Sequence, residues 1–212
     1  QLYYRSTVHI PVFGPLVSRV DPTRSCGISL PGRYAYQSFF GIPKVQTVML
    51  FRMIVSEGLS HYSYFIGSGT TAAVIDPRRD CRVYADLAAE NGMQIRYIFE
   101  THRNEDFCSG SVALAAQTGA DILHGSALPF RFGRPVHGGD RFRIGNLVAM
   151  VRETPGHIRE SISIAVWEPS VSPQVLMIFT GDALLAGDTG RVDFFGPEKT
   201  PEMAGLLFDS LK

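Results

Sequence analysis

The stretch QIRYIFETHRNEDF, residues 94–107, decides the fold, because it holds a complete strand and the loop that follows it. Apolar or aromatic side chains stand at every second position over residues 95–99, which is the period of a β-strand. The strand is predicted to end at Glu100, with Thr101 and His102 directly beyond it. Loops at the ends of buried strands are where proteins often carry functional side chains, so His102 becomes a candidate.

The same arrangement, a strand followed by a short turn with one metal-binding side chain, occurs twice more along the chain. The predicted strand Leu147–Val151 leads to the turn 154–157, which ends in His157. The predicted strand 175–179 leads to Asp182. With His102, these residues form a set of two imidazoles and one carboxylate, the facial triad that non-heme Fe(II) oxygenases use with coordination positions left open. The remaining histidines are interpreted as structural or incidental; they are His9, His61, His124 and His137.

Helices and further strands surround these loops. A helix is predicted through Val83–Ala88 with Asp80 as its cap, and a second over Ser111–Thr118 before Gly119. Further strands are predicted over residues 121–124, 141–144 and 161–167. Strands linked by helical crossovers, followed by antiparallel hairpins, predict an α/β sandwich with its helices outside.

Composition excludes several classes of protein. The 212 residues include 20 basic and 20 acidic side chains, so no basic surplus is present for nucleic acid. No apolar run approaches the length of a membrane span, and no membrane contact is predicted. Cys26, Cys81 and Cys108 are widely spaced and lack a CxxC pair, which favours a reducing compartment and small buried thiols.

Residues 1–48 differ from the rest of the chain. They carry five Arg or Lys residues, one acid and several prolines, and no signal peptide is visible. We interpret residues 1–48 as an extension or arm of unknown role, and residues 49–212 as the main domain. A cytoplasmic location is expected, with an organelle matrix as the alternative if the arm is a transit remnant.

Three of these segments together resemble a known family. Residues 101–107, 154–157 and 180–182 are similar to motifs of the metallo-β-lactamase superfamily, which implies an αββα sandwich. Four stretches narrow the resemblance to the persulfide dioxygenase branch, often joined to rhodanese domains: Glu57–Leu59, Ile75–Asp80, Glu100–His102 and Gly187–Arg191. The resemblance covers about residues 49–211. It implies that His102, His157 and Asp182 hold one Fe(II) per chain, with zinc as the alternative.

The chain departs from the superfamily pattern at two positions. Dinuclear zinc hydrolases of the superfamily carry HxHxDH, whereas Asn104 and Phe107 occupy the places of its second and last histidines. Neither side chain is a good metal ligand, so the ligand set that survives is the mononuclear one. The late histidine-bearing loop of the family is not found before Lys212, so the C-terminal part of the family domain is expected to be missing from this chain.

Two further residues are assigned supporting catalytic roles. Asp106 is expected to orient a ligand histidine or its loop, with capping of the following helix as the alternative. Arg191 is a candidate for holding a carboxylate of a thiol such as glutathione, with a loop-locking pair to Asp193 as the alternative. Cys108 lies beside the metal loop and is interpreted as a packed thiol rather than a carrier of persulfide.

The resemblance implies an iron-dependent dioxygenase that oxidises a low-molecular-weight persulfide, of the glutathione or coenzyme A type, to sulfite and thiol. O2 is then a co-substrate and a rhodanese a partner, and a homo-oligomer is the default expectation. Two alternatives stay open. One is a metal-dependent thioester hydrolase similar to glyoxalase II, and the other is a non-catalytic protein of the same fold.

Overall fold

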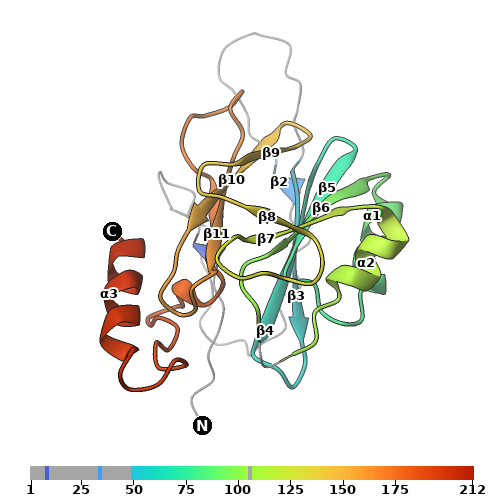
Figure 1. The fold of residues 1–212 in the computed structure, drawn as a ribbon. Helices are drawn as coiled ribbons and strands as arrows, with labels where there is room; N and C mark the ends of the chain where they lie inside the picture. Colours follow the sequence, from blue (N-terminus) through green and yellow to red (C-terminus); the bar gives the residue numbers. More distant parts are fainter. Residues whose placement is uncertain (1–7, 10–32, 35–48, 105–106) are drawn as a thin grey trace, which may run out of the picture.

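Two β-sheets packed face to face form the centre of the molecule, seen here in a computed structural model that describes residues 8–9, 33–34, 49–104 and 107–212. Helices α1 (Arg82–Glu90) and α2 (Ser111–Thr118) cover the outer face of the larger sheet. Helix α3 (Thr200–Ser210) lies beyond the smaller sheet, at the opposite side of the molecule (Figure 1). This is the αββα sandwich predicted from the sequence.

The larger sheet has seven strands within the described residues, and its second half is parallel. Its spatial order is β2 (Arg33–Tyr34), β3 (Met49–Ser56), β4 (His61–Ser68), β5 (Thr71–Ile75), β6 (Gln94–Glu100), β7 (Asp121–Gly125) and β8 (Arg134–Val136). Strands β2 to β5 pair antiparallel, and β5 to β8 pair parallel. Parallel strands need crossovers, and α1 and α2 supply those before and after β6.

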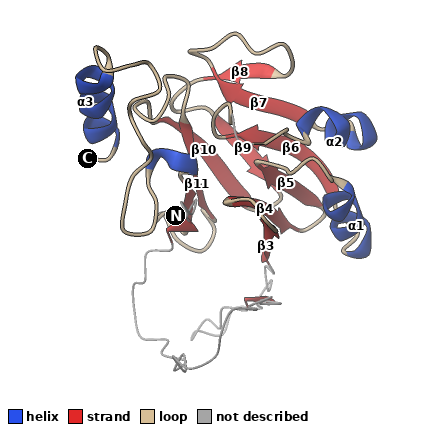
Figure 2. Cartoon of the chain, turned by 90° about the horizontal axis from the view of Figure 1, so that it is seen from below, coloured by secondary structure: helices blue, strands red, loops and turns tan. Residues whose placement is uncertain are grey.

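The smaller sheet is antiparallel throughout its described strands, as the turn-rich second half of the sequence predicts. Its order is β1 (Val8–His9), β12 (Met177–Phe179), β11 (Ile162–Trp167), β10 (Leu147–Glu153) and β9 (Arg141–Ile144). A short 3-10 turn, η1 (Gly181–Ala183), follows β12. Figure 2 shows the two sheets between α1 and α2 on one side and α3 on the other.

Strand β6 shows why this sequence builds a layered protein. Ile98 and Phe99 are both fully buried, but they face opposite sides of the sheet, as consecutive strand residues must. Phe99 packs into the core between the sheets, and Ile98 packs into the core beneath α1 and α2. A strand that is apolar on both faces belongs in a sheet covered on both sides.

One local prediction was wrong. Asp80 does not cap α1; the helix begins at Arg82, after Cys81, without a side-chain cap hydrogen bond. The Asp80 carboxylate instead lies 3.6 Å from the Arg78 guanidinium. The expected Asp cap therefore gave way to a local ion pair two residues before the helix.

The N-terminal region contributes short strands to both sheets. Val8–His9 pairs with β12, and Arg33–Tyr34 pairs with the start of β3. The other residues of the predicted arm, Cys26 among them, lie outside the described residues, and its role stays a prediction. No helix in the described ranges is long and apolar enough to cross a membrane.

Candidate metal centre

Three loops meet at one edge of the sandwich, and each brings one of the predicted metal ligands. His102 follows β6 of the larger sheet, whereas His157 follows β10 and Asp182 follows β12 of the smaller sheet. A backbone hydrogen bond of 2.8 Å, from the amide of Ile162 to the carbonyl of Thr101, joins the two sheets beside them. The site therefore depends on the packing of both sheets.

The three side chains form a compact cluster. One ligand atom from each of His102, His157 and Asp182 lies within 4.8 Å of the others. Asp182 Oδ2 is 3.9 Å from Nε2 of His102 and 3.7 Å from Nε2 of His157. The two imidazole rings lie nearly perpendicular, with centroids 5.1 Å apart. This arrangement directs both Nε2 atoms and one carboxylate oxygen toward a common point.

A chain of hydrogen bonds orients His102. The amide and the hydroxyl of Thr101 donate to the two carboxylate oxygens of Asp76, at 2.7 and 2.8 Å. With its proton directed to Asp76, Thr101 Oγ1 accepts from His102 Nδ1, 3.0 Å away. The proton then sits on Nδ1 and the lone pair on Nε2, which is the tautomer that a metal requires.

A backbone carbonyl fixes His157 in the same way. Its Nδ1 donates to the carbonyl oxygen of Arg191 at 2.9 Å, which leaves Nε2 free as a ligand atom. Gly190 makes this contact possible, because a Cβ at that position would lie 2.7 Å from His157 Nδ1. The amide of Gly190 also donates to the Asp182 carbonyl at 2.8 Å, so one short loop holds two ligand residues.

The turn that carries Asp182 is just as tightly constrained. Gly181 adopts a φ of +51°, in the left-handed region where side chains are disfavoured. A Cβ there would also collide with the Thr101 hydroxyl and come within 3.2 Å of His102 Nδ1. Glycine is therefore required at position 181, because the loop after β12 approaches the loop after β6 closely.

Burial keeps the His102 ring of the cluster in its neutral form. His102 and His157 are only 5% and 4% exposed. Burial lowers the pKa of His102 to about 4, although the Asp182 carboxylate acts in the opposite direction, so the ring is neutral at physiological pH. Its Nε2 makes no hydrogen bond within the described part of the chain. A buried nitrogen lone pair without a donor, beside a second imidazole and a carboxylate, fits a metal cation.

A neighbouring histidine, His61, differs from the two candidate ligands His102 and His157. Both of its ring nitrogens are hydrogen-bonded, Nδ1 to Ser56 Oγ and Nε2 to the Asp76 carbonyl, each at 2.9 Å. The Phe107 ring stacks on its face with centroids 3.7 Å apart. His61 is thus a buried structural residue, as its sequence context predicted, and Phe107 covers it with hydrocarbon.

The two supporting residues predicted from the sequence have different outcomes. Asp106 lies outside the described residues, and its role stays a prediction. Arg191 reaches the centre through its backbone carbonyl, while its exposed guanidinium forms a bidentate pair with Asp193 at 2.6 and 2.9 Å. The same guanidinium lies over the Phe194 ring, 4.6 Å from the centroid. The pair to Asp193 is the loop-locking alternative, and substrate binding by Arg191 stays a prediction.

Sequence reasoning missed two elements of the site and misjudged a third. Asp76 was noted only as part of a motif, yet it anchors Thr101 from a backbone with φ of +49°. Phe194, whose ring edge meets His157 at a centroid distance of 5.1 Å, carries no motif that would place it at the site. Cys108 is exposed, so its interpretation as a packed thiol was wrong, whereas Cys81 is buried as predicted.

Comparisons with known proteins agree with this geometry. The sequence profile of the metallo-beta-lactamase superfamily matches residues 57–175. The chain is 35% identical over 158 residues to the hydroxyacylglutathione hydrolase of Rhodospirillum rubrum, covering 72% of this chain and 56% of the relative. It is 29% identical over 174 residues to the mitochondrial persulfide dioxygenase ETHE1 of Mus musculus, covering 76% of this chain and 61% of the relative.

The fold is also similar to that of a solved structure. The crystal structure of ETHE1 from Myxococcus xanthus superimposes with a TM-score of 0.62 at 35% identity, covering 76% of this chain and 68% of that one. The chain spans a little over half the length of the two curated relatives. Since a hydrolase and a dioxygenase are similar to it at comparable identity, overall similarity does not separate the two activities.

Proposed function

The chain belongs to the metallo-β-lactamase superfamily, and from that premise we propose that it is a mononuclear iron(II) persulfide dioxygenase. The observation that carries this proposal is the composition of the ligand set. His102, His157 and Asp182 offer one facial triad, whereas Asn104 and Phe107 stand where a dinuclear hydrolase of the superfamily has histidines. A site with three protein ligands suits one iron with open positions.

The residues around the centre support this assignment through their protonation and orientation. Thr101 and the carbonyl of Arg191 hold the Nδ1 protons, so both imidazoles present neutral Nε2 atoms. Iron(II) bound by these atoms and Asp182 would supply the redox chemistry that O2 requires. The protein's part is then to bind and orient the persulfide and to exclude water from the buried imidazoles.

Differences in exposure indicate the side from which substrate arrives. The two histidines are almost fully buried, whereas 27% of the Asp182 side chain is exposed. A persulfide therefore reaches the centre past the carboxylate. The overall reaction is RSSH + O2 + H2O → RSH + SO3²⁻ + 2H⁺, in which the outer sulfur is oxidised, O2 is reduced and the thiol is regenerated.

The test combines metal content with oxygen uptake. Protein reconstituted anaerobically with Fe(II) is expected to hold about one iron per chain by plasma mass spectrometry and to consume O2 when glutathione persulfide is added. His157→Ala should lose both properties, and His137→Ala is the matched control because that histidine is exposed. Full iron occupancy in His157→Ala would contradict the ligand assignment.

A thioester hydrolase is the second candidate, favoured by the similarity to hydroxyacylglutathione hydrolase. Such an enzyme needs a metal-bound hydroxide as nucleophile. Hydrolysis of S-lactoylglutathione by the zinc-loaded protein, without persulfide-dependent oxygen uptake by the iron-loaded protein, would replace our proposal with this one. Failure to bind either metal would indicate a non-catalytic member of the superfamily.

A further inference from the structure

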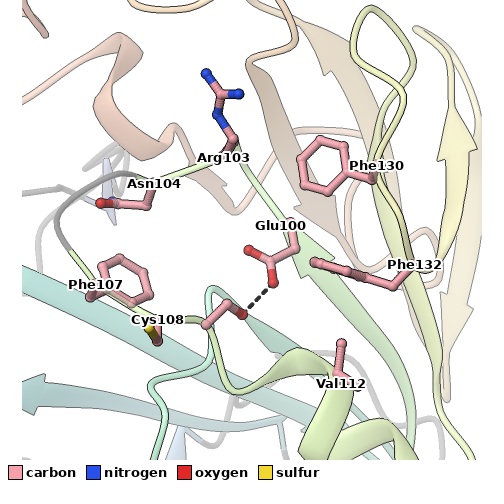
Figure 3. A pocket seen from close by; sticks show the side chains of 9 residues that line it. Glu100, Arg103, Asn104, Phe107, Cys108, Val112, Phe130 and Phe132 are labelled. Atoms are coloured by element: carbon pink, nitrogen blue, oxygen red, sulfur yellow. Dashed lines mark hydrogen bonds between the residues drawn. The ribbon is translucent and has the colours of Figure 1, made fainter.

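A cavity between the loop after β6, the start of α2 and the loop that joins β7 to β8 takes no part in the chemistry described so far. Its volume is about 290 Å³. We call it the aromatic pocket and define it by five of its lining residues (Figure 3), namely Glu100, Arg103, Phe107, Phe130 and Phe132. Because it combines aromatic rings with an acid and a base, its chemistry indicates the kind of molecule that it can bind.

Phenylalanine rings form the walls of the aromatic pocket. Figure 3 shows Phe107 on one side of the cavity and Phe130 and Phe132 on the other. Phe130 and Phe132 are nearly perpendicular, with an interplanar angle of 85° and centroids 5.6 Å apart, so that they form a corner. The faces of aromatic rings attract cations, and several rings around one space form the aromatic cages that bind quaternary ammonium groups.

Two buried histidines support these walls. The His124 ring stacks on Phe130 with centroids 4.2 Å apart, and the His61 ring stacks on Phe107 with centroids 3.7 Å apart. Each imidazole covers one face of its phenylalanine and leaves the opposite face available to the cavity. Since the rings are held in place before a ligand arrives, less ordering is needed on binding.

The interior of the aromatic pocket carries an acid. Glu100 is only 3% exposed, and one of its oxygens accepts hydrogen bonds from the hydroxyls of Ser109 and Ser111. The other oxygen makes no hydrogen bond with any described residue and faces the open space of the pocket (Figure 3). A buried carboxylate oxygen that opens on a cavity favours a positively charged ligand.

The walls also indicate which kind of cation fits. A primary ammonium group carries three N–H donors, as the lysine side chain does. Phenylalanine offers no acceptor, so such a group would leave donors unpaired against the rings. A quaternary ammonium group has no N–H, and its positively charged methyl groups pack against aromatic carbon. The aromatic pocket therefore suits a methylated nitrogen better than a primary amine.

The rim of the pocket suits a negative group on the same molecule. Arg103 is exposed, forms no ion pair with the described residues and extends outward (Figure 3). Its planar guanidinium matches the geometry of a carboxylate. Sites for drug-sized ligands occupy about 300–1,000 Å³, and this cavity lies at the lower end of that range, so the ligand is small.

From these observations we propose that the aromatic pocket binds a small quaternary ammonium compound that also carries a carboxylate. Its methylated nitrogen lies among the three phenylalanine rings and beside Glu100, and its carboxylate pairs with Arg103. This binding goes beyond the proposed function and does not depend on it, because the ligand is not a thiol and no candidate metal ligand lines the pocket.

Titration calorimetry of the full chain with glycine betaine tests the proposal. The matched control is 3,3-dimethylbutyrate, which keeps the shape and the carboxylate but has carbon in place of the charged nitrogen. Betaine should bind at least about tenfold more tightly than this analogue, because only betaine has a cation for the rings and for Glu100. Glycine, with its three N–H donors, should also bind at least about tenfold more weakly than betaine.

Cys108 reports the place of binding, because its exposed thiol lines the pocket. Alkylation by iodoacetamide is followed peptide by peptide by mass spectrometry. At about ten times its dissociation constant, betaine occupies about nine chains in ten, so Cys108 alkylation should slow about tenfold. The alkylation rate of buried Cys81 is the internal control and should not change.

Variants examine the rings and the charges separately. Phe132→Leu keeps an apolar side chain, removes a ring and should weaken betaine binding about fivefold or more; Phe208→Leu, at an exposed phenylalanine of α3, should not. Glu100→Gln keeps an acceptor for the two serines and should weaken binding by a similar factor. Arg103→Ala should weaken it as well, whereas Arg79→Ala, at an exposed arginine elsewhere, should leave it unchanged.

The proposal is overturned if 3,3-dimethylbutyrate or glycine binds as tightly as betaine, if betaine leaves the Cys108 rate unchanged, or if a folded pocket variant keeps the wild-type affinity. The comparison of the three compounds uses the unaltered chain, so it decides the matter even where a variant does not fold. Betaine binding by a protein that fails to bind iron would retain the aromatic pocket and reject the dioxygenase. Iron binding and oxygen uptake without betaine binding would do the reverse.

Discussion

His102 and His61 lie close together, are equally buried and belong to the same edge of the sandwich, yet only His102 has a ring nitrogen that makes no hydrogen bond within the described residues. His102 has one nitrogen tied to Thr101 and the other left without a partner among the described residues. His61 has both nitrogens hydrogen-bonded and one face covered by Phe107. Since burial is the same in both residues, the spare Nε2 with its proton on Nδ1 is what makes His102 the candidate ligand.

The same comparison supports the proposal that the centre holds one metal. His157 follows the pattern of His102, with Nδ1 on a carbonyl and Nε2 directed to Asp182. Around His61, every available nitrogen is already used by Ser56 and Asp76. A second metal beside the first would find aromatic carbon of Phe107 on that side. The following predictions test this contrast.

The largest effect is expected from Asp182→Asn, which keeps the shape of the side chain and removes its charge. The iron affinity should fall by more than the roughly 100-fold that loss of an outer hydrogen-bond partner costs. Competition with a chelator measures the affinity. Asp188→Asn changes an exposed acid in the same loop and should leave iron binding unchanged; equal affinities in the two variants would remove Asp182 from the ligand set.

Acid should destabilise the metal-free protein through His102. An unfolded histidine has a pKa of 6.5 and His102 has a folded pKa of about 4, so between these values the unfolded state binds more protons. The contribution of His102 to the unfolding free energy is therefore fully present above pH 6.5 and is lost as the pH falls toward 4. Between pH 7 and pH 4.5 the unfolding free energy should fall by about 2 kcal/mol through this residue.

Urea unfolding of the chelator-treated protein at pH 7 and pH 4.5 measures this effect. His102→Gln lacks the titrating ring, so its unfolding free energy should fall by about 2 kcal/mol less over the same interval. The same pH dependence in both proteins would show that His102 is accessible to protons in the folded state, contrary to its burial.

Thr101→Val should weaken iron binding about tenfold, because it removes the oxygen that accepts the Nδ1 proton of His102 and thereby fixes its tautomer. Thr101→Ser keeps the hydroxyl and is the matched control. The affinity of each variant for iron is measured by the same chelator competition. A Val variant as tight as the Ser variant would mean that packing alone orients His102.

The smallest effect on the metal is expected from His61→Gln. Its iron content should stay at the wild-type value, since neither nitrogen of His61 is free to act as a ligand. Its unfolding free energy should fall by about 1–3 kcal/mol, because Ser56 or the Asp76 carbonyl loses a buried partner. Loss of iron in this variant, at a temperature where the protein is folded, would contradict the contrast with His102.

Much of the fold was predictable where a short periodic segment is followed by a residue that typically ends a strand or a helix. Strand β6 was predicted within one residue, and α2, stopped by Gly119, was predicted with its observed bounds. Strand β8 was missed because Pro135 in its centre argues against a strand. Helix α3 was missed although it has proline near its start; its buried residues are only Met203 and Leu207, a weak apolar pattern.

The candidate site was predictable in its side chains and not in its backbone contacts. The residue types of His102, His157 and Asp182, each just beyond a strand, indicated the cluster that the fold brings together. The Arg191 carbonyl on His157 could not be predicted, because any residue offers a carbonyl. Nor could the positive φ of Asp76, whose carboxylate accepts the hydrogen bonds that Thr101 donates.

The wide spacing of the three ligands along the chain has a consequence for the protein's lifetime. An ion held by His102, His157 and Asp182 would act as a cross-link between segments that an unfolded chain keeps far apart. Because it binds only the folded arrangement, it would raise the unfolding free energy by an amount that grows with the concentration of free metal. Iron supply would then govern how long the chain survives proteolysis as well as whether its centre is complete.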